Sequence, residues 1–370
     1  MLREDQVRQA EKPEGQGRGL LSGPDQEMPR GCQEASMRDR GGKALPEAVR
    51  TVIAAQGLVK RFGDVTAVAG IDFDVPAGEI FGFLGPNGAG KTTTINMLVG
   101  LARPTTGRIW VAGIDCTKNG KAAQHLIGVV PDESNLYPEL TGFENLCFCA
   151  ALYGMPRRER EPRARELLGI FGLAEAAGRK FAGYSKGMKR KLAIAAGIIH
   201  SPAILFLDEP TTGIDVASAR QIRQLIVEMN RVGTTIFLTT HYIEEAERLC
   251  HRIAFIVSGK IARIDTVENL LQQSQGRHIM EFAVDRPASG LQDKLRDAFP
   301  DLECEAVAHG GLRVISGKPV RIGPLVRFLE EHGLEVGEAR KVRPSLEEVF
   351  VQVTGIEAAA MKREKSGGGA

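Results

Sequence analysis

Short apolar runs alternate with amphipathic stretches between residues 51 and 264, and this alternation predicts an α/β core. The run 80–84 is apolar throughout, and the stretch 92–101 after it has a helical pattern. The runs 203–209 and 234–241 are apolar on both faces before each ends in polar residues. This pattern is typical of parallel strands that are buried between helices.

The rest of this region adds further strands and a helical stretch. Residues 141–200 are predicted to be helical, and their charged segment 157–168 has the amphipathic spacing of a solvent-facing helix. Ser258 and Gly259 separate two short runs that are predicted to form a hairpin. The additional strands are predicted at residues 52–55, 70–75, 107–113, 125–130, 253–257 and 260–264.

Beyond residue 270 the pattern changes to strand, helix, two strands, helix and strand, which is the order of ferredoxin-like folds. A final helix is expected after Ser345, because Ser345 and Glu348 have the spacing of a capping box. The apolar stripe of this helix is Leu346, Val349, Phe350 and Val353. The preceding elements are predicted at residues 278–284, 291–299, a hairpin around 310–311, 322–331 and 336–342.

A chain of 370 residues is long enough for two domains. We predict a first domain at residues 51–270 and a small α+β domain at residues 271–355. Residues 1–50 and 356–370 are rich in small, polar and charged residues, so we expect a disordered leader and a disordered tail.

Charge and hydropathy narrow the classes of partner. The formal net charge is only +2, whereas a chain that binds nucleic acid as a polyanion is usually far more basic, so no nucleic-acid partner is expected. No apolar run approaches the ~20 residues that a membrane-spanning helix needs. Any membrane role is therefore expected to come through a partner.

The strongest candidate for chemistry follows the apolar run 80–84, where the sequence has the G-x-x-x-x-G-K-[ST] spacing of a phosphate-binding loop between a strand and a helix. Glycines let backbone N–H groups approach phosphate oxygens, and the helix N-terminus adds its positive dipole end. We predict that Lys91 bridges the β- and γ-phosphates and that Thr92 ligates Mg²⁺. The predicted nucleotide-binding residues of this loop are Gly85, Asn87, Gly88, Ala89, Gly90, Lys91, Thr92 and Thr93.

Further polar motifs follow the phosphate loop in a fixed order. They are Ser185 and Gly187, then Asp208 and Glu209, then Asp215, and finally His241. The combined order resembles that of the ATPase subunits of ATP-binding-cassette transporters, and the resemblance covers residues 52–264. It implies a P-loop cassette ATPase with a mixed β core and a helical subdomain, to which the small C-terminal α+β domain is added.

The resemblance implies a metal-binding role for one of these residues and catalytic roles for two others. Asp208 matches the carboxylate that holds Mg²⁺ through water, Glu209 matches the residue that polarises the attacking water, and His241 matches the residue that contacts the γ-phosphate. Adjacent residues that leave a strand point in opposite directions, so Asp208 can face the metal while Glu209 faces the water.

The signature region is the second part of the resemblance. Ser185 and Gly187 match the motif that, in this family, faces ATP held by the other subunit, and Asp215 matches a loop that crosses the dimer interface. Ser185 is also suited to cap the helix that follows it. The basic run 189–191 in that helix is expected to be a solvated face rather than an anion site.

Two departures from the commonest family pattern affect the predicted site. Phe62 stands where a tyrosine usually stacks on adenine, and it keeps an aromatic face for that contact. Asp132 stands where a glutamine is usual, and its carboxylate is a hard oxygen ligand that suits Mg²⁺. We predict that Asp132 contacts the metal directly or through water. The alternative is a solvent-facing turn residue, with Glu133 in the metal role.

Two further departures are Lys186 and Met188 in the signature motif. Together with residues 345–350, the departures resemble the branch of bacterial drug and sodium exporters that is related to the daunorubicin exporter. In that branch the ATPase and the membrane permease are separate chains.

The resemblance therefore implies an ATPase that uses Mg²⁺ with ATP and pairs with a second copy of itself or with a paralogous ATPase. It would act at the cytoplasmic face of the inner membrane and drive export through a separate transmembrane permease. The alternatives are a soluble cassette ATPase that acts on ribosomes or DNA, and the ATPase of an importer. Ribosomal members usually carry two cassettes, DNA-repair members insert a long coiled coil, and importer ATPases carry a C-terminal β-barrel. The cargo cannot be named, because its contacts would lie in the permease.

Overall fold

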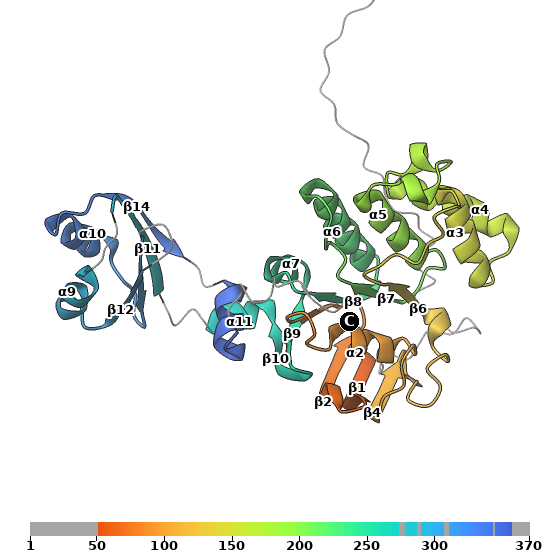
Figure 1. Cartoon of the computed structure of the whole chain (residues 1–370), viewed down its shortest axis with the longest axis horizontal. Helices are drawn as coiled ribbons and strands as arrows, with labels where there is room; N and C mark the ends of the chain where they lie inside the picture. The colour runs from red at the N-terminus through yellow and green to blue at the C-terminus, as the bar shows by residue number, and fades with distance from the viewer. Residues whose placement is uncertain (1–50, 274–277, 287–289, 307–310, 343–344, 357–370) are drawn as a thin grey trace, which may run out of the picture.

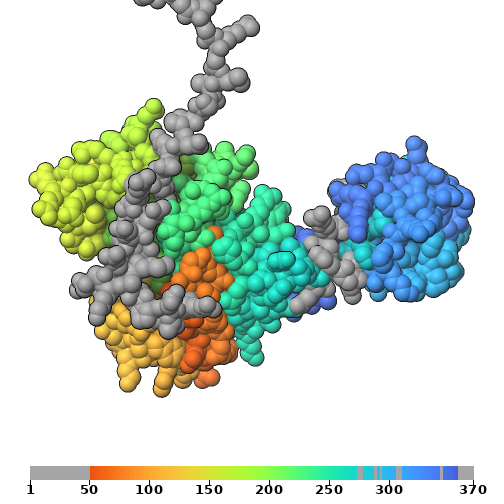
Figure 2. Space-filling model, turned by 180° about the vertical axis from the view of Figure 1, so that it is seen from behind, coloured from red at the N-terminus to blue at the C-terminus, as the bar shows by residue number. Residues whose placement is uncertain are grey.

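The computed structural model describes residues 51–273, 278–286, 290–306, 311–342 and 345–356. The strands form three sheets. Figure 1 shows two sheets together in one body, which we call the larger unit (residues 51–273), and the third sheet set apart in a smaller unit (residues 278–342). From behind, the blue smaller unit is again a lobe of its own (Figure 2). The predicted disordered ends lie outside the described residues, except for Ile356.

The first sheet is antiparallel, with the order β2-β1-β4-β5. Its strands are β1 (Thr51–Phe62), β2 (Val65–Pro76), β4 (Thr106–Val111) and β5 (Ile114–Asp115). β1 and β2 are much longer than predicted, because pairing across the tight turn at Gly63 carries polar residues such as Lys60 into the sheet. Gly63 has a φ of 56°, a left-handed conformation that favours glycine.

The second, central sheet has the order β10-β9-β3-β8-β7-β6, and all its strands are parallel except β10. Its strands are β3 (Ile80–Leu84), β6 (Ile127–Val130), β7 (Ile204–Asp208), β8 (Thr235–Thr240), β9 (Arg252–Val257) and β10 (Lys260–Thr266). Every residue of β3, β7 and β8 is buried, which confirms the prediction of parallel strands that are covered on both faces. The carboxyl ends of these strands meet at one edge of the sheet, where ligand sites of such sheets usually lie.

Seven helices of the larger unit connect these strands. Four of them are α2 (Lys91–Leu98), α6 (Val216–Arg231), α7 (Ile243–Leu249) and α8 (Val267–Gln273). The predicted helical region contains the other three, which are α3 (Gly142–Leu152), α4 (Arg157–Ile170) and α5 (Lys186–Gly197). Short 3₁₀ turns lie at Gln124–Leu126, Ala174–Ala176 and Phe181–Gly183. Within the described ranges, no helix combines the length and apolarity that a membrane crossing needs.

The smaller unit has an antiparallel sheet with the order β12-β13-β11-β14, and this order confirms the predicted ferredoxin-like arrangement. Its elements are β11 (His278–Val284), α9 (Leu291–Ala298), β12 (Leu302–Ala306), β13 (Leu312–Ser316), α10 (Ile322–Glu331) and β14 (Val336–Val342). Side chains such as Met280, Phe282, Leu295 and Leu329 form a hydrophobic core that is separate from those of the larger unit.

The last helix, α11 (Leu346–Thr354), begins at its cap Ser345, whose side chain accepts a hydrogen bond from the backbone N–H of Glu348 at 3.3 Å, as predicted. This helix is predicted to belong to the C-terminal domain, but its apolar stripe packs into the core of the larger unit. Phe350 is fully buried there and packs edge-on against Phe255, with 5.3 Å between ring centroids. The helix lies against α7, α8, β9 and β10, and its stripe shares the hydrophobic core of the larger unit.

Candidate active site

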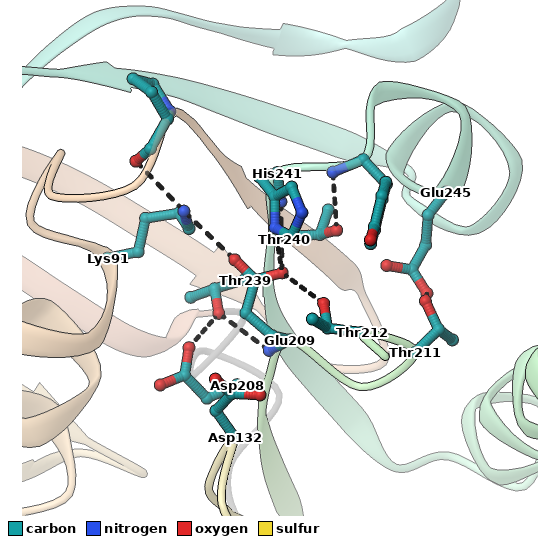
Figure 3. Close-up of polar contacts among 12 residues, drawn as sticks. Lys91, Asp132, Asp208, Glu209, Thr211, Thr212, Thr239, Thr240, His241 and Glu245 are labelled. Atoms are coloured by element: carbon teal, nitrogen blue, oxygen red, sulfur yellow. Dashed lines mark hydrogen bonds and ion pairs between the residues drawn. The ribbon is translucent and has the colours of Figure 1, made fainter. Parts of the chain in front are cut away.

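Polar side chains from four strand ends converge at the carboxyl edge of the central sheet (Figure 3). The loop after β3 leads to Lys91, the segment after β6 carries Asp132, and the ends of β7 and β8 supply the rest. We call Lys91, Asp208, Glu209, Thr239 and His241 the strand-end cluster. The structure therefore brings together the predicted lysine, both predicted carboxylates and the predicted histidine.

The phosphate loop is held so close to its neighbours that two of its glycines cannot be replaced without movement. A Cβ at Gly85 would lie 2.1 Å from the carbonyl oxygen of Ile256, and one at Gly90 would lie 2.5 Å from that of Ala67. Gly90 is also left-handed, with a φ of 105°. Gly90 is the N-cap of α2 and has no side chain to cap it, so the first N–H groups of the helix are available to an anion.

Lys91 is buried and lies beside Glu209 in the cluster. Its Nζ donates hydrogen bonds to the carbonyl oxygens of Gly85 at 2.7 Å and Pro86 at 3.2 Å. The same nitrogen forms an ion pair with Oε1 of Glu209 at 3.2 Å. The ammonium group is thus held at the base of the phosphate loop, where it can reach a bound phosphate.

Glu209 and His241 form a buried pair. Oε2 of Glu209 lies 2.8 Å from Nδ1 of His241 and accepts hydrogen bonds from the His241 backbone N–H at 3.3 Å and from Thr212 at 3.1 Å. Burial alone would raise the pKa of Glu209, but the bond to His241 and the charge of Lys91 outweigh it, so the pKa lies below its ordinary value. Glu209 is therefore a charged acceptor at neutral pH, as a residue that orients a water needs to be.

The oxygen atoms predicted for a metal lie on neighbouring segments. Oδ1 of Asp208 accepts a hydrogen bond from the hydroxyl of Thr239, while the Thr92 side chain is exposed at the start of α2. No group of three or more His, Cys, Asp or Glu side chains in the described part of the chain could hold a metal alone. The carboxylate of Asp208 and the hydroxyl of Thr92 fit Mg²⁺, which commonly binds one or two carboxylates together with phosphates and water.

Arg190 corrects the prediction that residues 189–191 form a solvated face. Its side chain is only 6% exposed and points into the larger unit. It donates hydrogen bonds to the carbonyl oxygens of Pro131 at 2.6 Å and Asp208 at 3.2 Å, and to that of Glu209. Its Nη2 also lies 3.4 Å from Oδ1 of Asp132, whose side chain is 53% exposed. Burial is the main factor that raises the pKa of Asp132, and Arg190 opposes it.

Glu245 is a second residue that the sequence analysis missed. It is 4% exposed, and its Oε1 accepts a hydrogen bond from the Thr211 hydroxyl at 2.6 Å. Burial raises the pKa of Glu245 above its usual range, although hydrogen bonds to Thr211 and Thr240 oppose the rise. A signal was present, because Glu245 lies in the first turn of α7, whose N-cap Tyr242 directly follows His241.

The signature residues lie beside the N-terminus of α6 in the same chain. Ser185 is exposed and caps α5 by accepting a hydrogen bond from the backbone N–H of Met188 at 3.2 Å, as predicted. Gly187 permits close packing, since a Cβ there would lie 2.3 Å from the hydroxyl of Ser218. Asp215 caps α6 through the backbone N–H of Ser218 at 2.9 Å. These residues lie outside the strand-end cluster.

Phe62 also lies outside the strand-end cluster. It ends β1, its ring is 56% exposed, and the ammonium of Lys60 lies 4.9 Å from the ring centroid. An exposed aromatic face beside a cation offers a surface on which a planar base could stack.

Comparisons with known proteins agree with this geometry. The profile of the family described as ABC transporter matches residues 68–212. The linearmycin resistance ATP-binding protein LnrL of Bacillus subtilis (strain 168) is 36% identical over 82% of this chain and 98% of that protein. The daunorubicin/doxorubicin resistance ATP-binding protein DrrA of Streptomyces peucetius is 37% identical over 82% of this chain and 92% of that protein.

Two solved structures are similar to the larger unit. The ATP-binding subunit of an ABC transporter has a TM-score of 0.56 at 29% identity and matches 61% of this chain and 94% of that one. A dimeric ATP-binding cassette in a post-hydrolysis state, bound to ADP and Pi, has a TM-score of 0.55 at 27% identity, over 58% of this chain and 98% of that one.

Proposed function

The chain belongs to the ATP-binding proteins of ABC transporters, and on this premise we propose that it powers the export of drug-like molecules through a separate membrane permease. As a member of this family it binds ATP and is an ATPase. Cassettes of the family form dimers and work with membrane components. The observation that carries ATP hydrolysis in this proposal is the contact of Lys91, Glu209 and His241 at one edge of the central sheet.

We infer that Lys91, Glu209 and His241 have different roles in ATP binding and hydrolysis. Lys91 binds the β- and γ-phosphates, together with the backbone N–H groups of residues 87–93. The phosphates compete with Glu209 for the Lys91 ammonium, which now lies 3.2 Å from the carboxylate. Once the Glu209 carboxylate is released from Lys91, it accepts a hydrogen bond from the attacking water. His241 keeps its hydrogen bond to Glu209, which orients the carboxylate, and faces the γ-phosphate.

Mg²⁺ is the proposed cofactor, and it supplies charge neutralisation for the phosphates when it is bound. Thr92 and Asp208 are the proposed protein ligands, with Asp132 in contact directly or through water. Asp132 already has a cationic neighbour in Arg190 at 3.4 Å. We expect Asp132→Asn to raise the Mg²⁺ concentration that gives half-maximal ATPase activity, and Asp132→Gln to recover much of that loss. If Asp132→Asn and wild type give superimposable Mg²⁺ titrations while Glu133→Gln shifts the curve, Glu133 rather than Asp132 is the residue that contacts the metal.

The proposed partner in hydrolysis is a second copy of the chain, arranged head to tail, or a paralogous ATPase. Ser185 is exposed at the N-terminus of α5, whose N–H groups and dipole suit an anionic phosphate across an interface. Asp215 lies at the start of the neighbouring α6 and is the proposed contact that crosses the same interface.

Export is favoured over import by two observations. The two relatives compared above are named for resistance to linearmycin and to daunorubicin or doxorubicin. The smaller unit has a ferredoxin-like sheet, whereas the importer alternative calls for a β-barrel in that position. With export through a permease, the proposed location is the cytoplasmic face of the inner membrane.

The test of export uses a drug-sensitive bacterium that expresses the chain together with its permease. We expect the wild-type pair to raise the daunorubicin concentration that stops growth, and the pair with Glu209→Gln to lose this protection. Equal protection by both pairs would contradict export that is driven by hydrolysis at this site. Linearmycin and a fluoroquinolone serve as further probes of the cargo class.

The proposed adenine contact leads to a prediction for Phe62. Stacking of a base on an aromatic ring is worth about 1–3 kcal/mol, so Phe62→Ala is expected to weaken ATP binding roughly 5- to 150-fold. Phe62→Tyr keeps the ring face and is the matched control, with near-normal affinity. Equilibrium titration with ATP measures both variants. If Phe62→Ala binds ATP as tightly as wild type, adenine does not stack on this ring.

A further inference from the structure

The backbone of Glu209 is held in a conformation that residues other than glycine rarely adopt. Its φ is 49°, in the left-handed region, although Glu209 is not a glycine. Such a conformation costs on the order of 1–3 kcal/mol and persists only where neighbouring groups fix it. On one side, the backbone N–H of Glu209 donates to the carbonyl oxygen of Thr239 at 3.1 Å. On the other side, the carbonyl oxygen of Glu209 accepts a hydrogen bond from the backbone N–H of Thr212 at 3.3 Å.

The side chain of Arg190 adds contacts to the peptide groups on both sides of this turn. Its guanidinium donates to the carbonyl oxygens of both Asp208 and Glu209. These oxygens belong to the two peptide groups that flank the Cα of Glu209, and rotation of these groups is what φ and ψ describe. Both bonds come from Nη2, while Nη1 of the same planar guanidinium donates to the carbonyl oxygen of Pro131. The single ammonium nitrogen of a lysine cannot hold the turn and this second segment with the same geometry.

The other contacts of Arg190 connect this turn to two more segments. Its Nη1 donates to the carbonyl oxygen of Pro131 at 2.6 Å, and its Nη2 lies 3.4 Å from Asp132. Arg190 itself lies on α5, the helix that begins at Ser185. One buried side chain thus connects the signature helix, the segment after β6 and the end of β7.

We infer that Arg190 is a positioning residue for ATP hydrolysis, which fixes the strained turn at Glu209 and couples it to the orientation of the signature helix. This inference rests on the proposed function of Glu209. A residue with a purely structural role would affect the unfolding temperature but not the turnover of the folded protein. A positioning residue lowers turnover in the folded protein, because a small displacement of a reacting group can cost as much as ~10²-fold in rate.

The test measures kcat and KM for ATP, well below the unfolding temperature, for the full chain with Arg190→Gln and with Arg190→Lys. We expect Arg190→Gln to lower kcat about 10- to 100-fold, with KM changed by less than about threefold, because Lys91 and the phosphate loop keep their own contacts. Arg190→Lys keeps the charge but loses the fork, and an intermediate kcat is expected. Lys189→Gln is the matched control, because its ammonium lies over the Phe181 ring at 5.5 Å, away from Glu209.

Wild-type kcat in folded Arg190→Gln or Arg190→Lys would overturn the inference. If Arg190→Gln does not fold, Arg190→Lys alone decides, since it retains a cation in the buried site. An equal fall in kcat for Lys189→Gln would also contradict the inference, because the fall would then result from the loss of a positive charge on α5 rather than from the contacts of Arg190. The proposed function is judged separately, by ATP hydrolysis in the wild type and its loss in Glu209→Gln.

Discussion

Replacement of Glu209 by Gln is expected to leave ATP binding intact and to slow turnover at least ~10³-fold, which corresponds to about 4 kcal/mol of activation free energy. The amide has nearly the shape of the carboxylate, so the phosphate loop keeps its geometry. It lacks the negative charge that Lys91 and His241 now stabilise, and it cannot accept the proton of an attacking water. The measurement is phosphate release by the purified chain at saturating Mg-ATP, beside an equilibrium titration of ATP binding.

The matched control for this variant is Glu244→Gln on the neighbouring helix α7. Glu244 is 85% exposed and pairs only loosely with Arg248, at 3.7 Å, so its replacement removes the same charge without a contact to the cluster. We expect normal turnover from Glu244→Gln. Near-normal turnover from Glu209→Gln would remove Glu209 from its proposed role in hydrolysis.

Mg-ATP is expected to convert the Glu209→Gln protein from monomer to dimer, and the further change Ser185→Arg is expected to abolish this conversion. A protein that binds ATP but does not hydrolyse it should accumulate the state in which phosphate lies between two subunits. Ser185 is exposed at the start of α5, where a long guanidinium side chain would fill the space that the partner's phosphate requires. Light scattering with and without Mg-ATP measures the change in mass.

Ser185→Ala separates the loss of the helix cap from the obstruction of the interface. Loss of the cap costs about 1 kcal/mol of stability, so Ser185→Ala should still dimerise. An unchanged mass for Glu209→Gln with Mg-ATP would contradict a homodimer and favour a paralogous ATPase as the partner. A dimer that persists with Ser185→Arg would contradict the proposed position of the signature motif.

The central sheet could be predicted from the sequence because burial on both faces leaves an unmistakable pattern. β7 and β8 are buried along their whole length, and the polar residues that follow their apolar centres locate Asp208 and His241. β1 was underestimated because its second half is half-exposed, includes polar residues such as Lys60, and contains irregular pairing. Strand pairing there is decided by the partner strand rather than by the composition of either strand.

The phosphate loop could be predicted because its chemistry requires particular residues at fixed spacing. Arg190 could not, because it stands between two lysines whose side chains are half-buried, and nothing in the run distinguishes the one that turns inward. Its acceptors come from residues 131–132 and 208–209, which are distant in the sequence. Contacts of this kind depend on how α5 packs on the sheet, and a local pattern does not record that packing.

The return of α11 to the larger unit has a consequence for how the chain is made. Residues 278–342 are synthesised between two parts of one hydrophobic core. Phe255 can pack against Phe350 only after almost a hundred further residues have been translated. At about 5–20 residues per second, a ribosome takes on the order of 5–20 seconds to cover that distance, and the apolar side chains that α11 covers stay exposed meanwhile. A chain shortened at residue 270 would leave these side chains exposed permanently. Aggregation, rather than a specific loss of ATP hydrolysis, is then the expected failure.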